Sequence, residues 1–255
     1  MTVLTIMMFV IGTFFGSFYC CIANRLSKNE SIIKPGSHCE NCNHRLTWYE
    51  LIPVFSFIIQ GGKCRKCKIK LSKEYLIAEI ATGLLFALSF YFFQFSYKTI
   101  SLLLLSSLLV TTIISDFKYM IILDEVLIPI AVGLIIVMFF EYNYIFVLKM
   151  ILRGFTTFVL FLIIKLLGDK AFKQESLGWG DIKLSFVAGL MLGFRLSLVY
   201  MFLAALIALP YGLILRKIKE EPLMPFGPFL TMSLCIIYVL SPIFNNLMDL
   251  LIIGG

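Results

Sequence analysis

Long apolar stretches alternate with short polar segments along almost the whole chain. An α-helix of about 20 apolar residues crosses the hydrocarbon core of a bilayer, and most of these stretches approach that length. Taken in order, they predict eight helices, at residues 2–23, 75–96, 99–115, 124–140, 145–166, 182–194, 196–215 and 229–253. We therefore predict an all-α polytopic membrane protein with about eight transmembrane helices.

The composition supports this fold class. Hydrophobic residues make up 60% of the chain and charged residues 15%, and the mean hydropathy is +0.96. Soluble domains of similar length are far more polar. The first apolar stretch carries no charged side chain and lacks the basic start of a cleavable signal peptide. We predict that residues 1–23 form a permanent first transmembrane helix.

The net charge of +7 is distributed unevenly along the chain. If the eight helices alternate in direction, eighteen Lys and Arg residues lie in or beside the loops of one side. Only Lys98 and Arg195 lie on the other side. Cytoplasmic loops carry such an excess of positive charge. The polar segment 24–74 is therefore predicted to be cytoplasmic, and the basic loops are expected to meet anionic lipid headgroups rather than nucleic acid.

The segment 24–74 contains two C-x-x-C pairs, which predict a small tetracysteine module. The cysteines are Cys39, Cys42, Cys64 and Cys67. Four thiolates in two such pairs suit a tetrahedral Zn²⁺ site. Two disulfides are the alternative, but disulfides are rare in the cytoplasm. Neither pair offers a histidine or an open coordination position, so the predicted zinc is structural.

Three aspartates at predicted helix ends are the candidates for chemistry. Asp116 ends the third helix, Asp124 begins the fourth, and Asp181 begins the sixth. An acid in or beside a span is a functional candidate, although Asp181 could serve as an N-cap and Asp116 as a solvated helix end. Lys118 and Lys183 each follow an aspartate by two residues. They could extend to the headgroups or help to keep a carboxylate ionised.

Two carboxylates close together in a low-dielectric site share a proton, as in the aspartic proteases. One form can then take a proton from water while the other donates to a carbonyl oxygen. Gly178 and Gly180, just before Asp181, would let an extended substrate approach without meeting a Cβ.

The segment Gly178-x-Gly180-Asp181, downstream of Ser115-Asp116 and Asp124, resembles the motif of the GxGD aspartic proteases. Further segments, matching in order, resemble the bacterial type IV prepilin peptidases, which are leader peptidases and N-methyltransferases. These segments are Gly16-Ser17-Phe18, Arg25-Leu26, both cysteine pairs, Leu51-Ile52-Pro53, Tyr75 to Glu79 with Thr82-Gly83, and Pro225 to Leu230. The resemblance covers nearly the whole chain.

Three positions depart from the pattern of that family. Cys20 stands where the family usually has Asn, Ser27 where Pro follows the Arg-Leu pair, and Leu123 where Pro precedes the third acid. The first two lie in the half associated with methyl transfer. These departures therefore concern methyl transfer more than proteolysis.

The resemblance implies a membrane aspartic peptidase in the inner membrane of a bacterium, with its active site facing the cytoplasm. It would cut short basic leaders from prepilin-like precursors at a Gly-Phe-type site. Asp116 and Asp181 would be catalytic, with Asp124 and the neighbouring glycines and lysines in support. The module 24–74 would serve N-methylation of the new N-terminus by S-adenosylmethionine. From the residues themselves, we expect this donor to bind between the module and the cytoplasmic ends of the first and second helices, where Arg25 could bind its carboxylate and Glu79 could face its cationic end. Residues 75–255 would form the peptidase domain.

The sequence leaves several questions open. A transporter with midplane acids would predict symmetric halves, and a zinc scaffold without catalysis would predict no role for the aspartates. A further possibility is that Arg25 only anchors the first helix at the headgroups. The resemblance does not distinguish a role in pilus assembly, protein secretion or competence for DNA uptake.

Overall fold

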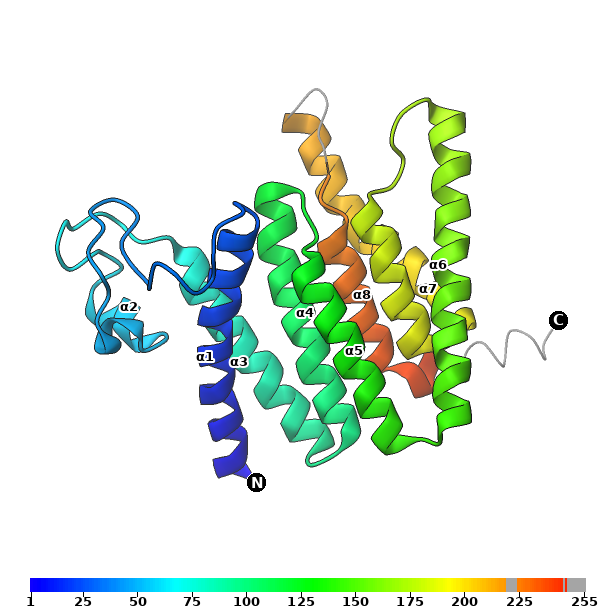
Figure 1. The fold of residues 1–255 in the computed structure, drawn as a ribbon, viewed down its shortest axis with the longest axis horizontal. Helices are drawn as coiled ribbons and strands as arrows, with labels where there is room; N and C mark the ends of the chain where they lie inside the picture. Colours follow the sequence, from blue (N-terminus) through cyan, green and yellow to red (C-terminus); the bar gives the residue numbers. More distant parts are fainter. Residues whose placement is uncertain (219–223, 245, 247–255) are drawn as a thin grey trace. The chain divides into compact units, whose positions relative to one another are not determined.

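The structure, a computed structural model, describes residues 1–218, 224–244 and 246, and it is helical throughout these residues apart from loops and two isolated β-bridges. The helices, in chain order, are α1 (Thr2–Leu26), the 3₁₀-helix η1 (Trp48–Leu51), α2 (Phe55–Ile59), α3 (Lys73–Phe93), α4 (Tyr97–Tyr119), α5 (Asp124–Glu141), α6 (Tyr144–Phe172), α7 (Trp179–Ile218) and α8 (Gly227–Val239) (Figure 1). The predicted all-α fold class is confirmed. The structure adds η1 and α2, two short helices inside the cysteine module that the apolar pattern did not predict.

The chain forms two compact units, Met1–Tyr119 and Met120–Gly255. In the first unit, α1 packs along α3, and both contact α4. Glycines make the close approach of α1 and α3 possible. A Cβ on Gly12 would lie 2.8 Å from the Cα atom of Gly83, and a Cβ on Gly16 would lie 2.6 Å from the carbonyl oxygen of Ala78. Small residues at such crossings let helix backbones pack directly in a membrane.

In the second unit, α7 packs against α6 and α8, and α5 contacts α6 and α7. The backbone of α7 is non-helical at Gly193, where φ is 75° and ψ is 169°. The sequence predicts two helices, 182–194 and 196–215, that meet beside this glycine. The structure joins them across a kink instead of a loop.

Within the described residues, five helices are long and apolar enough to cross a membrane: α1, α3, α4, α6 and α7. The predicted eight spans are therefore only roughly matched. α5 has 18 residues but carries three acids, α8 has 13 residues, and the kinked α7 combines two predicted helices. Residues 245 and 247–253 of the last predicted helix lie outside the described residues.

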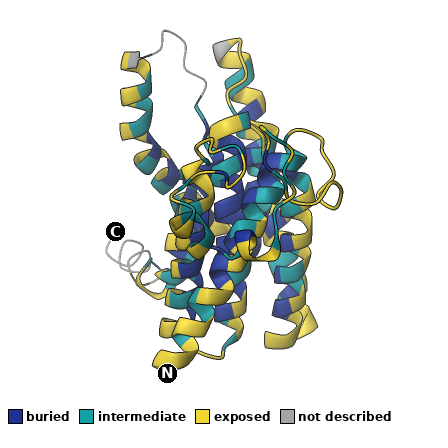
Figure 2. Ribbon diagram, turned by 90° about the vertical axis from the view of Figure 1, so that its left-hand side faces the viewer, coloured by how far each residue is buried: buried dark blue, intermediate teal, exposed yellow. Residues whose placement is uncertain are grey.

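Large apolar side chains are exposed along these helices, as lipid contact requires. Examples from both units are Phe14, Leu84, Phe140, Leu148 and Phe202, with exposed fractions between 50% and 72%. Figure 2 shows exposed positions along the outer sides of the helices and buried positions between them. The chain is a multi-pass membrane protein.

Two helix ends differ from the sequence prediction at the candidate aspartates. α4 continues to Tyr119, so Asp116 lies inside its last turn instead of ending the helix. α7 begins at Trp179, so Asp181 is the third helical residue and not an N-cap. In contrast, α5 begins at Asp124 as predicted, and its N-cap is Leu123.

Candidate active site and metal centre

The four cysteines of the module converge. Their sulfur atoms all lie within 4.8 Å of one another, and all four cysteines are free thiols. The Sγ atoms of Cys39 and Cys67 are 3.8 Å apart, and those of Cys42 and Cys64 are 3.9 Å apart. Four sulfurs at about 2.3 Å from a central Zn²⁺ would be about 3.8 Å from one another, whereas a disulfide bond is about 2.05 Å long. The donor set and its dimensions thus fit a zinc ion.

The two C-x-x-C segments fold as matching knuckles. In the first, the backbone N–H of Cys39 donates to the carbonyl oxygen of His44, and in the second, that of Cys64 donates to Ile69. The residue after each second cysteine, Asn43 or Lys68, has a positive φ that closes the turn.

The backbone N–H of Ile69 also contributes most to lowering the pKa of the Cys67 thiol to about 6. In the same cluster, a backbone hydrogen bond from His44 lowers the pKa of the Cys42 thiol, but burial and the other three thiols outweigh it and raise this pKa to about 11. A thiolate is the form that binds a metal.

Three segments of the family resemblance meet at Glu79 of α3. The Glu79 carboxyl accepts a hydrogen bond of 2.7 Å from the backbone N–H of Val54, which follows the Leu51-Ile52-Pro53 segment. The Ser17 side chain of α1 is a further partner of the same carboxyl. Val54 has a φ of 63°, which is unusual for a β-branched residue. Glu79 therefore holds the strained turn at Val54, in the middle of the module, against α3.

Arg25 holds the start of the module. Its guanidinium donates to four backbone carbonyls between Ser31 and Gly36, at 2.8–3.4 Å. Both predicted donor contacts, Arg25 and Glu79, thus have intramolecular partners that order the loop.

In the first unit, a polar network closes the end of α4 that carries Asp116. Lys118 Nζ donates to Asn24 Oδ1 at 2.8 Å and to Glu74 Oε2 at 2.9 Å, and the Tyr119 hydroxyl donates to the same Asn24 oxygen at 3.0 Å. These bonds connect α4 to α1 and α3. Asp116 itself is buried, with 6% of its surface exposed.

In the second unit, Asp181 is 8% exposed and lies beside the two glycines of its motif. A Cβ on Gly178 would lie 3.2 Å from Asp181 Oδ2, and a Cβ on Gly180 would lie 2.7 Å from the Cβ of Ile122. Because Gly180 has no side chain, Ile122 can pack directly against the first turn of α7. Gly178 leaves space next to the Asp181 carboxylate.

Lys183 and Asp124 form an ion pair. Lys183 Nζ lies 2.8 and 2.6 Å from the two carboxylate oxygens of Asp124. Both side chains are a little under half exposed. The pair joins the first turn of α5 to the first turn of α7, next to Asp181.

Lys165 was not singled out by the sequence analysis, yet it organises the segment before Asp181. It is buried on α6, and its Nζ donates to the carbonyl oxygen of Leu177 at 2.7 Å and lies 3.1 Å from Asp169. Asp169 in turn accepts hydrogen bonds from the backbone N–H and the hydroxyl of Ser176. Lys165 is a charged residue within an apolar stretch of the sequence, and this feature could have identified it as a functional candidate.

A buried tyrosine, also missed from the sequence, lies on the other side of the kink in α7. Tyr200 is fully buried, and its hydroxyl has no hydrogen-bond partner among the described residues. Ser115, beside Asp116, likewise has a buried hydroxyl without such a partner. Unsatisfied buried polar groups are uncommon in native structures.

Comparisons with known proteins cover both units. Residues 10–93 match the model of the bacterial peptidase A24 N-terminal domain, and residues 102–213 match that of the type IV leader peptidase family. The chain is similar to the prepilin leader peptidase/N-methyltransferase of Bacillus subtilis, with 32% identity over 91% of this chain and 92% of the relative.

Proteins of the same description from Pseudomonas aeruginosa and Neisseria gonorrhoeae are 28% and 29% identical. These matches cover 80% and 83% of this chain, and 71% and 73% of the respective relatives. No solved structure matches the chain.

Proposed function

The chain belongs to the type IV leader peptidase family, and we propose that it removes the leader from prepilin-like precursors with Asp116 and Asp181 as its catalytic pair. The observation that carries this proposal is the burial of both carboxylates, each within one turn of a helix end. Ionisable side chains buried in membrane proteins are costly, and they occur where function needs them.

The proposed reaction is that of an aspartic protease. The ionised carboxylate of the pair takes a proton from a water molecule, and the water oxygen attacks the scissile carbonyl carbon. The protonated carboxylate gives its proton to the carbonyl oxygen. When the tetrahedral intermediate collapses, the C–N bond breaks and the leaving amine receives a proton. The space beside Asp181 that Gly178 leaves open would admit the extended substrate.

The substrate class follows from the family. The precursor would carry a short basic leader with a Gly before the cut, usually a Phe after it, and then an apolar helix. The distribution of Lys and Arg residues supports a cytoplasmic active site in the inner membrane of a bacterium. Neither a transporter nor a scaffold without catalysis is favoured, since every named relative is a leader peptidase.

Substitution of the aspartates tests this proposal. Asp116→Asn and Asp181→Asn should each abolish precursor cleavage in membranes while leaving expression unchanged, because an amide cannot relay the proton. Asp124→Asn should only reduce cleavage, since its carboxylate pairs with Lys183. Glu141→Gln, at the exposed end of α5, is the matched control. Cleavage at the wild-type rate by the Asp181→Asn variant would contradict the mechanism.

We further propose that the same chain methylates the new N-terminal amine. The relatives carry N-methyltransferase in their names, and S-adenosylmethionine would supply an electrophilic methyl group when bound. The module would hold this donor, and Zn²⁺ on Cys39, Cys42, Cys64 and Cys67 would fold the module without an open coordination position. Donor contacts by Arg25 and Glu79 remain a hypothesis from the sequence, since both side chains have structural partners.

A further inference from the structure

The short helix α2 of the cysteine module exposes an apolar face. Phe55, Ile58 and Ile59 lie on the same side of this helix, because their spacing is that of neighbours on a helical surface, and they are 66%, 64% and 82% exposed. Phe57 instead packs on the second knuckle, where a Cβ on Gly62 would lie 3.1 Å from its ring. The helix therefore packs one face on the module and leaves the apolar face open.

The contact between the module and α3 brings this face to the level of the membrane surface. α3 is long and apolar enough to cross a membrane, and it starts with the charged residues Lys73 and Glu74. Glu79, which accepts the hydrogen bond from the backbone N–H of Val54, lies six residues after Lys73, or about 9 Å along the helix. Because Val54 directly precedes α2, the helix begins at this depth. Interfacial helices insert their apolar face by about 5–10 Å.

A neighbouring aromatic residue fits the same location. Trp48 of η1 is 77% exposed, and tryptophan is enriched where a membrane meets water. α3 itself exposes Ile77 and Leu84, with exposed fractions of 64% and 50%, as lipid contact requires. Large exposed apolar side chains that lie together mark an interaction surface. At the depth of Glu79, the partner available to the apolar face of α2 is the lipid.

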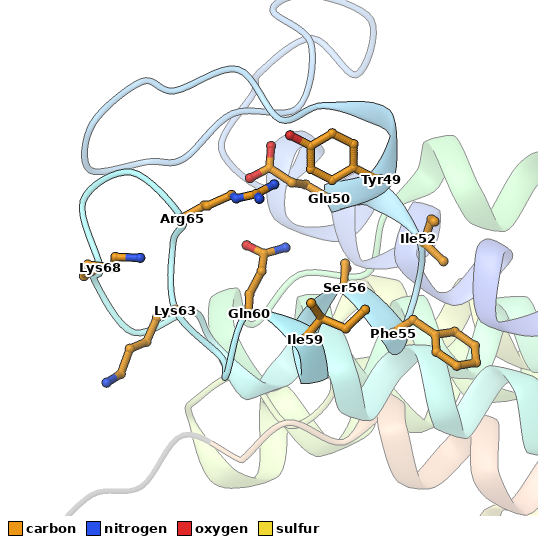
Figure 3. A pocket seen from close by; sticks show the side chains of 10 residues that line it. All are labelled: Tyr49, Glu50, Ile52, Phe55, Ser56, Ile59, Gln60, Lys63, Arg65 and Lys68. Carbon is orange, nitrogen blue, oxygen red and sulfur yellow. The ribbon is translucent and has the colours of Figure 1, made fainter.

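A pocket of about 340 Å³ lies beside this face, between η1, α2 and the second knuckle. Phe55 and Ile59 of the apolar face belong to its lining. Three exposed cations line it as well, namely Lys63, Arg65 and Lys68. Figure 3 shows Gln60 rising from α2 and Arg65 reaching in from the knuckle. The pocket thus places positive charge directly next to apolar surface.

The exposed charges of the pocket are all positive. Glu50 also lines it, but this side chain is only 6% exposed and is bound within the module. Its Oε2 atom accepts hydrogen bonds from the backbone N–H and the hydroxyl of Thr47, at 2.9 and 2.7 Å, and lies 3.3 Å from His44 Nε2. The Arg65 guanidinium lies 5.2 Å from the centre of the Tyr49 ring, a contact that holds it at the pocket. Such cations bind phosphate oxygens with charge-assisted hydrogen bonds.

We propose that the face of η1 and α2 lies in the membrane interface, and that the pocket beside it binds the headgroup of an anionic phospholipid. Arg65 and Lys68 contact the phosphate, while Phe55 and Ile59 contact the glycerol and the start of the acyl chains. A phospholipid carries its phosphate directly next to apolar chains, and the pocket has the same order of chemistry. A free anion would leave the apolar part of the lining without a partner. This inference does not depend on the proposed peptidase or methyltransferase activity.

Tryptophan fluorescence of the full-length protein in lipid nanodiscs tests the proposal. The substitution Trp179→Phe leaves Trp48 as the only tryptophan. Phosphatidylcholine and phosphatidylglycerol are mixed, and either lipid carries bromine atoms near the start of its acyl chains, which quench tryptophan on contact. Both brominated lipids should quench Trp48, because η1 lies at the interface. Brominated phosphatidylglycerol should reach the same quenching at about one tenth of the lipid fraction, because the pocket cations select it.

Two paired variants of the second knuckle separate the pocket from general surface charge. Arg65→Gln/Lys68→Gln should abolish the preference for phosphatidylglycerol. Lys66→Gln/Lys70→Gln removes the same charge at exposed residues that do not line the pocket, and it should keep the preference within about twofold. Zinc content, measured on the same samples, shows that the knuckle is folded. If Arg65→Gln/Lys68→Gln loses zinc, Lys63→Gln decides and should reduce the preference.

The remaining outcomes decide between occupants. Ile58→Ser/Ile59→Ser should weaken quenching by both lipids, and absence of quenching in the unmodified face would overturn the membrane position of α2. Equal quenching by the two lipids, or equal loss of preference in the two paired knuckle variants, would overturn the headgroup site. Loss of the preference in excess inorganic phosphate at constant ionic strength would assign the pocket to a free anion instead of a lipid.

Discussion

Gly180 shows how a single hydrogen atom in place of a side chain sets the position of Asp181, the proposed catalytic residue. The glycine lies in the first turn of α7, one residue before Asp181, and Ile122 packs directly against it. Gly178 precedes the helix and borders the Asp181 carboxylate. The two glycines of one motif therefore have separate physical roles, of which the sequence analysis anticipated only substrate access.

We expect Gly180→Ala to impair the protein more than Gly178→Ala. The new Cβ would lie 2.7 Å from the Cβ of Ile122 and 2.9 Å from its Cδ1, so the chain must shift. Such overpacking typically costs about 1–3 kcal/mol. The Gly178 Cβ would lie 3.2 Å from a carboxylate oxygen, which can rotate away. Thermal unfolding in detergent measures this difference, and equal losses of stability in the two variants would contradict the packing role of Gly180.

At the scale of elements, the segment before Asp181 depends on α6. Lys165 and Asp169 bind the backbone or side chains of Ser176 and Leu177, and Lys165 Nζ also lies 5.7 Å from the centre of the Trp179 ring. A buried ammonium with these partners fixes the loop at the point where α7 starts. The geometry of the GxGD segment is thus set from a neighbouring helix.

Lys165→Met should lower kcat for precursor cleavage by about 10- to 100-fold, because the Leu177 carbonyl loses its donor and the loop shifts. Lys165→Arg should recover part of the loss, since it keeps the charge. Lys170→Met, on the exposed side of the same helix, is the matched control. A change in KM alone, with kcat unaltered, would argue against a positioning role for Lys165.

The apolar pattern predicted these helices because lipid-facing and buried positions both require apolar side chains. It placed the end of α4 too early, since Asp116 to Tyr119 read as polar. Their helical conformation depends on hydrogen bonds from Lys118 and Tyr119 to Asn24, which is distant in sequence. The hydrogen bond between Lys165 and Leu177 could not be predicted from the sequence either. Its acceptor is a backbone carbonyl oxygen, which every residue type has, so the identity of residue 177 gives no indication of the bond.

The cysteine spacing did predict a cluster, since two matching knuckles can hardly fold otherwise around four thiolates. The pocket that residues of η1, α2 and the second knuckle line was not predictable. It depends on the positive φ of Val54 and on the buried Glu50, neither of which the sequence pattern marks. The roles of Asp116 and Asp181 rest on the family resemblance and remain a proposal that the substitutions above test.

At the scale of the whole molecule, one unit carries both the module and Asp116, and the other carries Asp181. The boundary at Tyr119 differs from that of the matched family models, the second of which begins at residue 102 and includes most of α4. α4 packs with α1 and α3 through the Lys118–Asn24–Glu74 network. The module and the first aspartate are therefore supported by the same helices.

Removal of the metal should separate the two activities. A zinc chelator should unfold the module and abolish donor binding and methylation first, while cleavage declines less, because Asp116 and Asp181 lie on membrane helices. Lowering the pH should have the same order of effects, since protonation of the thiolates releases the metal. The order of loss can be measured on one preparation by elemental analysis, labelled-donor transfer and precursor cleavage. Simultaneous loss of methylation and cleavage would contradict the prediction.

The orientation of the first unit gives a last prediction. The module precedes α3, whose 21 residues span roughly 32 Å at 1.5 Å per residue, and Phe95 follows the other end with 82% of its surface exposed. Since the basic module is expected in the cytoplasm, Phe95→Cys should react with an impermeant thiol reagent in sealed right-side-out vesicles. The wild-type cysteines of the module should react only after permeabilisation and chelation. Labelling of the wild type in sealed vesicles treated with an impermeant chelator, with Phe95→Cys adding nothing, would reverse the topology and place the proposed active site outside the cytoplasm.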